Sequence, residues 1–92
     1  MGIGGFIVEG KVVMINRSDN LIAVLTEEDE FTIFEILDIF CNINLGDIVR
    51  GDLETLGRLT LYNESRQEDF EVYIEDIHGS ENTARRLLNL KT

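Results

Sequence analysis

Residues 69–77 alternate between apolar and polar side chains, and this stretch constrains the fold more than any other. Phe70, Val72 and Ile74 fall on one side of an extended backbone, because successive side chains of a strand point to opposite faces. Tyr73 and the glutamates beside it fall on the other side. This pattern predicts a half-buried β-strand whose outer face is acidic.

Five other short stretches carry the β-branched and aromatic residues typical of strands and end at polar turn sequences. They span residues 6–16, 21–26, 31–37, 48–53 and 58–62. Gly10 interrupts the first stretch, which predicts a β-bulge or the sharp bend of a barrel corner. Residues 38–45 fit either a short helical turn or irregular structure, since asparagines follow Phe40 and Cys41.

A helix is predicted over residues 80–91. Ser80 suits the N-cap, because its hydroxyl can accept a hydrogen bond from a free amide of the first turn. Ala84, Leu87 and Leu88 share one face at helical spacing. A helix of about ten residues is marginal alone, so we expect this one to dock on the β-domain or on a partner.

The length and the strand pattern predict a single domain over residues 1–92. Its β-barrel is expected over residues 6–78 and its helix over residues 80–91. The predicted class is mainly β, a small antiparallel barrel or sandwich of five to six strands. A closed barrel is favoured because closure leaves no strand edge exposed.

The order of the strands is similar to that of OB-fold domains. Residues 10–15 resemble the first OB strand with its bending glycine, and residues 21–37 resemble the second and third strands. The sequence Leu-Gly-Asp-Ile-Val at residues 45–49 resembles the start of the fourth strand, and residues 69–77 resemble the fifth. The strand-like piece at 58–62 departs from this OB-like pattern, so a small barrel of another topology stays an alternative.

The resemblance implies binding of single-stranded nucleic acid or an oligosaccharide on the face of the second and third strands. The charge argues against nucleic acid, since 18 acidic against 8 basic residues give a net charge of −10, and such a surface repels phosphate. Residues 21–37 contain no lysine or arginine, and their connecting tip, residues 27–30, consists of four acids. The leading hypothesis is a non-enzymatic interaction module that binds a protein with a basic surface.

Four residues are candidates for partner binding. Tyr62 and Tyr73 are expected on the outer faces of their strands, and tyrosine is enriched at protein contacts. Each of them could equally be a barrel residue with a wet hydroxyl. Arg85 and Arg86, with Lys91 in the final helical turn, form the only local cluster of bases. They could pair with acids on the barrel or reach an anionic ligand.

No catalytic or metal-binding constellation is expected, and neither is a cofactor. His78 is the only histidine, and neighbouring carboxylates would raise its pKa if they lie close to it. Cys41 is the only cysteine and is expected to be buried and inert. Asp47 is expected at a solvated strand end. The acids at 27–30 lack the alternating ligands and the turn glycine of a calcium loop.

The first residues and the charge predict a cytoplasmic protein that does not bind membranes. The N-terminus lacks the basic start and the apolar run of a signal peptide. Glu9 and Lys11 interrupt the apolar stretch before it could span a bilayer. An acidic surface also repels anionic lipid headgroups.

Overall fold

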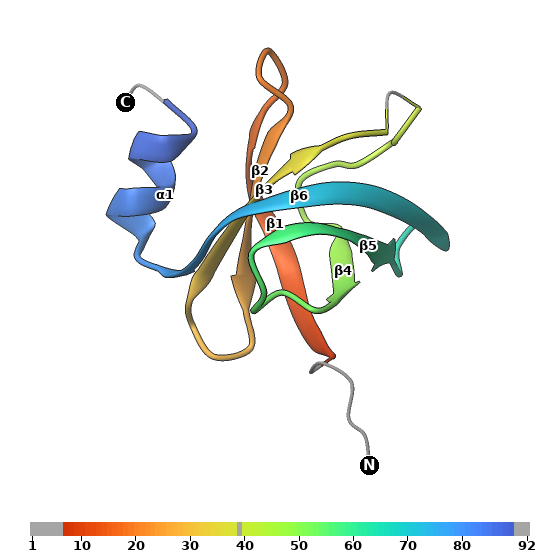
Figure 1. Cartoon of the computed structure of the whole chain (residues 1–92), viewed down its shortest axis with the longest axis horizontal. Coiled ribbons are helices and arrows are strands. Elements are labelled where there is room, and N and C mark those ends of the chain that lie inside the picture. The colour runs from red at the N-terminus through yellow and green to blue at the C-terminus, as the bar shows by residue number, and fades with distance from the viewer. Residues whose placement is uncertain (1–6, 39, 90–92) are drawn as a thin grey trace.

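The computed structural model describes residues 7–38 and 40–89, which form six β-strands and one short helix (Figure 1). They are β1 (Val8–Asn16), β2 (Leu21–Thr26), β3 (Phe31–Ile36), β4 (Ile48–Gly51), β5 (Gly57–Asn63), β6 (Glu68–Gly79) and α1 (Glu81–Leu87). The strands close into an antiparallel barrel in the order β1-β2-β3-β6-β5-β4. The predicted class, a mainly β antiparallel barrel with a C-terminal helix, is confirmed with six strands.

Two consecutive three-stranded meanders build this barrel. The first contains β1, β2 and β3, the second contains β4, β5 and β6, and the pairs β3–β6 and β1–β4 join them. An OB-fold barrel has five strands. The additional strand here is β5, which corresponds to the piece predicted at 58–62 and pairs with β6 along its whole length.

Inward-facing side chains of the strands fill the barrel with one apolar core. The rings of Phe34 and Phe70 pack against each other in this core, with centroids 5.9 Å apart. Ile43 and Leu53 enter from the connections on either side of β4 and are fully buried. The core contains Val8, Val12, Ile22, Val24, Phe34, Ile43, Val49, Leu53, Leu61, Phe70, Val72 and Ile74. The inward residues of β6 are therefore those that the alternation predicted.

Gly10 is needed for close packing and does not form a bulge. The pairing of β1 with β4 runs without a break through Gly10, and its pairing with β2 begins at Gly10 and continues without a break to Val12. The bulge in β1 lies further on, where Val13 is the extra residue between Val12 and Met14. A Cβ atom at Gly10 would lie 3.0 Å from the Val24 side chain. The glycine therefore lets β1 approach its neighbours inside the barrel.

The second half of β6 is irregular where it pairs with β3. Two register shifts occur there, because Phe34 pairs with Ile74, Ile33 pairs with Asp76, and Phe31 pairs with Gly79. The first shift leaves Glu75 as an extra residue. A bulge re-aims the side chains beside it, and Glu75 and its neighbour Asp76 both line the outer surface described below.

The helix is shorter than the predicted span of 80–91. It runs over Glu81–Leu87, with Ser80 as the N-cap and Leu88 as the C-cap. The Ser80 hydroxyl accepts a hydrogen bond from the Thr83 amide at 3.2 Å, as expected. Lys91, predicted in the final turn, lies outside the described residues.

The helix docks on the barrel's outer face over β1, β2 and β3 (Figure 1). Ala84 and Leu88 are buried there, in a second apolar cluster with Met14, Ala23 and Ile33. Leu87, predicted on the same face as Ala84 and Leu88, is not buried with them, since its exposed fraction is 42%. At 3.6 residues per turn, Leu87 is rotated about 60° from Ala84, which places it at the edge of the contact.

Candidate functional site: an acidic groove beside the helix

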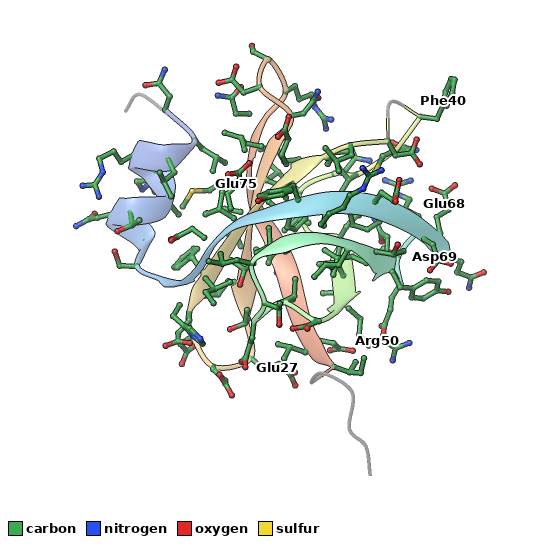
Figure 2. All side chains as sticks on the ribbon, in the orientation of Figure 1. Glu27, Phe40, Arg50, Glu68, Asp69 and Glu75 are labelled. Carbon is green, nitrogen blue, oxygen red and sulfur yellow. The ribbon has the colours of Figure 1, made fainter. Side chains whose placement is uncertain are left out.

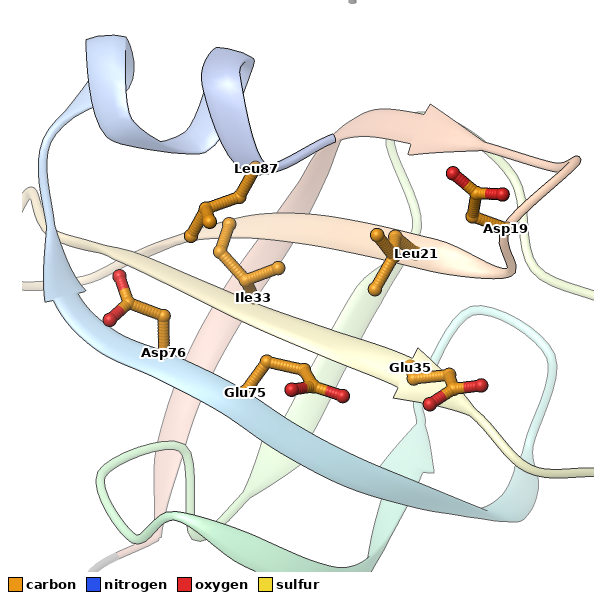
Figure 3. Close-up of a pocket in the computed structure, with 7 residues that line it drawn as sticks. All are labelled: Asp19, Leu21, Ile33, Glu35, Glu75, Asp76 and Leu87. Carbon is orange, nitrogen blue, oxygen red and sulfur yellow. The ribbon is translucent and has the colours of Figure 1, made fainter. Parts of the chain in front are cut away.

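A groove lies on the outside of the barrel, between the C-terminal end of α1 and strands β2, β3 and β6 (Figure 3). Its volume is about 430 Å³, which falls within the usual range of ligand sites, roughly 300–1,000 Å³. Three apolar and four acidic side chains line it: Leu21, Ile33, Leu87, Asp19, Glu35, Glu75 and Asp76.

The apolar part of the groove is the uncovered margin of the contact between helix and barrel. Ile33 is buried beneath it, Leu21 is partly buried, and Leu87 projects from the edge of α1 (Figure 3). The short helix covers only part of the apolar outer surface of β2 and β3. What remains uncovered is an apolar surface next to charged groups.

The four groove carboxylates come from three separate parts of the chain. Asp19 belongs to the turn between β1 and β2, Glu35 to β3, and Glu75 and Asp76 to the irregular half of β6. Among the described residues none of the four has a salt-bridge partner. Asp19 accepts one long hydrogen bond, at 3.3 Å, from the side-chain amide of Asn16. The groove therefore presents four carboxylates that no described base neutralises.

Sequence reasoning singled out none of these seven residues as a site. The strand pattern gave one usable signal, since Ile33 and Glu35 lie on the same side of an extended chain and juxtapose an apolar and an acidic side chain. The bulge at Glu75 and the edge position of Leu87 depend on tertiary pairing, which a single sequence does not display.

Tyr73 does not line the groove but is the neighbour of a residue that does, whereas Tyr62 lies away from it. Tyr73 is directly opposite Glu35 in the β3–β6 pairing, precedes Glu75 by two residues on the same strand, and is 45% exposed. Tyr62 lies further along the outer face of β5, where the Arg50 guanidinium covers its ring at 5.8 Å from the centroid. Tyr73 is therefore available as a contact for a partner, whereas Tyr62 already has a cation–π partner.

Arg85 and Arg86 lie outside the groove. Arg85 pairs with Glu81 one helical turn earlier, at 2.9 Å. It lines a second, largely apolar cavity on the other side of α1, together with Val13, Met14, Ile15, Leu25, Phe31, Leu45 and Glu81. Arg86 is exposed and has no salt-bridge partner among the described residues. The two arginines therefore do not belong to the same site as Tyr73.

The acidic hairpin tip is tied to the barrel at two points. Glu27 accepts a hydrogen bond from the Glu9 amide at 3.0 Å, and Glu30 binds Nδ1 of His78 at 2.6 Å. The hydrogen bond that Glu30 accepts from the ring, and then the charge of Glu30, raise the pKa of His78. Repulsion by Glu54 and the hydrogen bond between the two carboxyl groups raise the pKa of Glu28. No group of three side chains within the described ranges is placed to hold a metal ion.

Asp47 is buried, so the prediction of a solvated strand end is wrong. Its carboxylate accepts hydrogen bonds from the Asn44 amide and the Asn63 side chain, both at 3.0 Å, and from Arg66 Nε at 3.3 Å. Burial alone would raise its pKa, but these hydrogen bonds and the charge of Arg66 outweigh burial, and the pKa lies below its usual value. Asp47 therefore holds two connections of the barrel together.

Cys41 is partly buried, whereas the sequence predicted full burial. It packs against the barrel core in the irregular segment before β4. Desolvation, followed by the charges of nearby acids, raises its pKa to about 11. The neutral thiol is therefore favoured at pH 7, and a neutral thiol is a poor nucleophile.

Comparisons of the chain with protein-family models, with curated proteins and with solved structures find no match. Within residues 7–38 and 40–89, no helix has both the length and the apolar character needed to cross a bilayer. The chemistry of the groove is therefore the basis for assigning a function.

Proposed function

We propose that this protein is a non-enzymatic interaction module that binds a protein with a basic surface. The observation that carries the proposal is the groove beside α1, in which four carboxylates, none with a salt-bridge partner among the described residues, border an apolar floor. The apolar floor supplies contact area, and the carboxylates supply attraction and orientation for a positive partner.

The net charge of −10 supports the same kind of partner at longer range. A field of this sign speeds the approach of positively charged molecules and slows that of negative ones. The effect is screened beyond a Debye length of roughly 10 Å at 0.1 M salt. Binding is therefore expected to weaken steeply as salt is added.

The alternative function, binding of single-stranded nucleic acid or an oligosaccharide on β2 and β3, has less support. Ala23 and Ile33, which project outward from these strands, are covered by α1. The strands carry no lysine or arginine, and their connecting tip is acidic. Sequence-tolerant binders of single strands combine a basic groove with stacking aromatic residues.

Affinity capture with the immobilised protein tests the proposal. Native lysate is applied at about 50 mM salt, and the retained material is eluted with a salt gradient and identified. The proposal expects proteins of basic isoelectric point, released at moderate salt. Retention of nucleic acid instead, or of no protein at low salt, would contradict it.

A further inference from the structure

We propose that the groove beside α1 docks one extended segment of the partner, in which basic side chains alternate with apolar ones. This inference rests on the proposed function and adds the site and the chemistry of the bound segment. One side of the groove is mainly apolar and the other is acidic, so the groove favours a segment that offers apolar side chains to one side and basic side chains to the other.

An apolar side and an acidic side run alongside each other in the groove (Figure 3). Leu21, Ile33 and Leu87 lie toward β2 and the helix, whereas Glu75 and Asp76 lie on β6. Of the other two carboxylates, Glu35 lies on β3 between these sides, and Asp19 lies beyond Leu21 in the turn between β1 and β2. Successive side chains of an extended chain point to opposite sides. A segment laid along the groove therefore presents every second side chain to the apolar side and the intervening ones to the carboxylates.

The spacing of the groove residues matches the repeat of an extended segment. Leu21, Glu35 and Tyr73 are neighbours in one row across the strands, and Ile33 and Asp76 are neighbours in the next row. The two rows are two residues apart along β3, which corresponds to roughly 6.6 Å. Side chains two positions apart in an extended segment repeat at the same interval, so two successive basic side chains can each meet a carboxylate.

Other occupants fit this groove less well. A metal ion needs several ligands converging on one point, and no such group is found in the described part of the chain. A second copy of the chain would bring another net charge of −10 against the same acidic surface. A basic segment instead gains at each of the four carboxylates, which no base in the described part of the chain pairs with, and its apolar side chains cover the exposed edge of Leu87.

The size of the groove predicts a weak and reversible complex. About 430 Å³ accommodates only a few side chains, and interfaces below about 1,200 Å² are typical of transient encounters. We expect a dissociation constant on the order of micromolar for an isolated segment at low salt.

Fluorescence anisotropy with two labelled eight-residue peptides tests the inference. One peptide alternates arginine with leucine, and the other alternates arginine with serine, so that both carry the same charge. The groove variant Glu35→Gln/Glu75→Gln is compared with the charge-matched control Glu68→Gln/Asp69→Asn. The control residues are exposed at the far end of β6, away from the helix (Figure 2). A third variant, Leu87→Ser, removes an exposed apolar contact, and amide NMR spectra confirm that each variant is folded.

The inference expects the arginine–leucine peptide to bind more tightly than the arginine–serine peptide. The groove variant should weaken binding roughly 5- to 20-fold, and the control less than about twofold, given about 0–1 kcal/mol for each exposed charge pair. Leu87→Ser should weaken binding of the leucine peptide and leave that of the serine peptide unchanged.

Three results would overturn the inference. Equal binding of the two peptides would show that charge alone suffices, and equal effects of the groove and control variants would place binding elsewhere. In both cases the proposed function would stand if basic proteins were still captured from lysate. A concentration-dependent doubling of mass that Glu35→Gln/Glu75→Gln abolishes would assign the groove to a second copy.

Discussion

Asp47 receives hydrogen bonds from Asn44, Asn63 and Arg66, which lie in different parts of the chain. Its sequence context, a Gly-Asp step before a strand, gave no sign of burial, because two of its partners follow it by 16 and 19 residues. Sequence reasoning succeeds at the residue scale where the partner is local, as for the Ser80 cap and Thr83. It fails where the fold supplies the partner.

Asp47→Ala is expected to lower the free energy of unfolding by about 3 kcal/mol. The substitution leaves the Asn44 amide and the buried side chain of Asn63 without an acceptor, and an unsatisfied buried group costs roughly 1–3 kcal/mol. Urea unfolding measures the loss, with Glu68→Ala as the exposed control. A loss no larger than that of the control would contradict the role assigned to Asp47.

Because the pKa of Asp47 is lowered in the folded protein, the free energy of unfolding is expected to depend on pH in the acid range. A carboxyl group whose pKa is lower in the folded than in the unfolded protein stabilises the folded state at pH values above its pKa in the unfolded protein, which is near 3.8. This contribution is lost as the pH falls through the lower, folded value. Unfolding curves from pH 5 to pH 2 should therefore show a steeper decline for the natural protein than for Asp47→Ala. Parallel curves would contradict this account.

His78 sets a second pH dependence of opposite sign. Glu30 raises the pKa of His78 above the usual 6.5. The contribution of His78 to the stability of the folded state is therefore fully present below pH 6.5 and is lost as the pH rises through its pKa in the folded protein. NMR titration of the His78 ring should give a pKa above 6.5 that falls in Glu30→Gln. An unchanged pKa in that variant would show that the contact with Glu30 is not responsible.

At the scale of elements, strands were easier to predict than irregularities. β-branched and aromatic residues between polar turn sequences placed all six strands, and alternation of apolar and polar residues added the inward face of β6. The bulges at Val13 and Glu75 and the early end of α1 depend on pairing and packing between elements. The groove depends on the irregular half of β6 and on the end of α1, so the fold could be predicted and the candidate site could not.

Leu87 and Leu88 are adjacent in sequence but differ in burial, which provides a matched pair of substitutions. Leu88, the C-cap residue of α1, is fully buried against the barrel, whereas Leu87 is 42% exposed. Leu88→Ala should destabilise the protein by about 2–5 kcal/mol, the usual cost of removing a buried leucine side chain. Leu87→Ala should cost less than about 1 kcal/mol. Equal losses in urea unfolding would contradict the docking of α1 described here.

At the scale of the whole molecule, charge repulsion opposes a small number of ion pairs. A net charge of −10 on 92 residues destabilises the compact state. Five salt bridges lie within the described residues, and most of their side chains are substantially exposed, so each contributes little. Repulsion is therefore expected to dominate over attraction.

Moderate salt should accordingly stabilise the free protein while weakening its complexes. Raising NaCl from 10 to 200 mM screens the repulsion, and each 1 kcal/mol gained raises the melting temperature by roughly 4–8 °C for a domain of this size. Thermal melts at several salt concentrations measure the change. A melting temperature that falls with salt would show that the ion pairs matter more than the repulsion.

An amide-resolved NMR titration tests the central claim, that the acidic groove docks a basic segment, most directly. The labelled protein is titrated at low salt with the alternating arginine–leucine peptide and, separately, with a pool of single-stranded oligonucleotides. The account predicts that the peptide shifts the amides of Leu21, Glu35, Glu75 and Leu87 and that the oligonucleotides shift none. Oligonucleotide shifts on β2 and β3, with no peptide shifts at the groove, would contradict it.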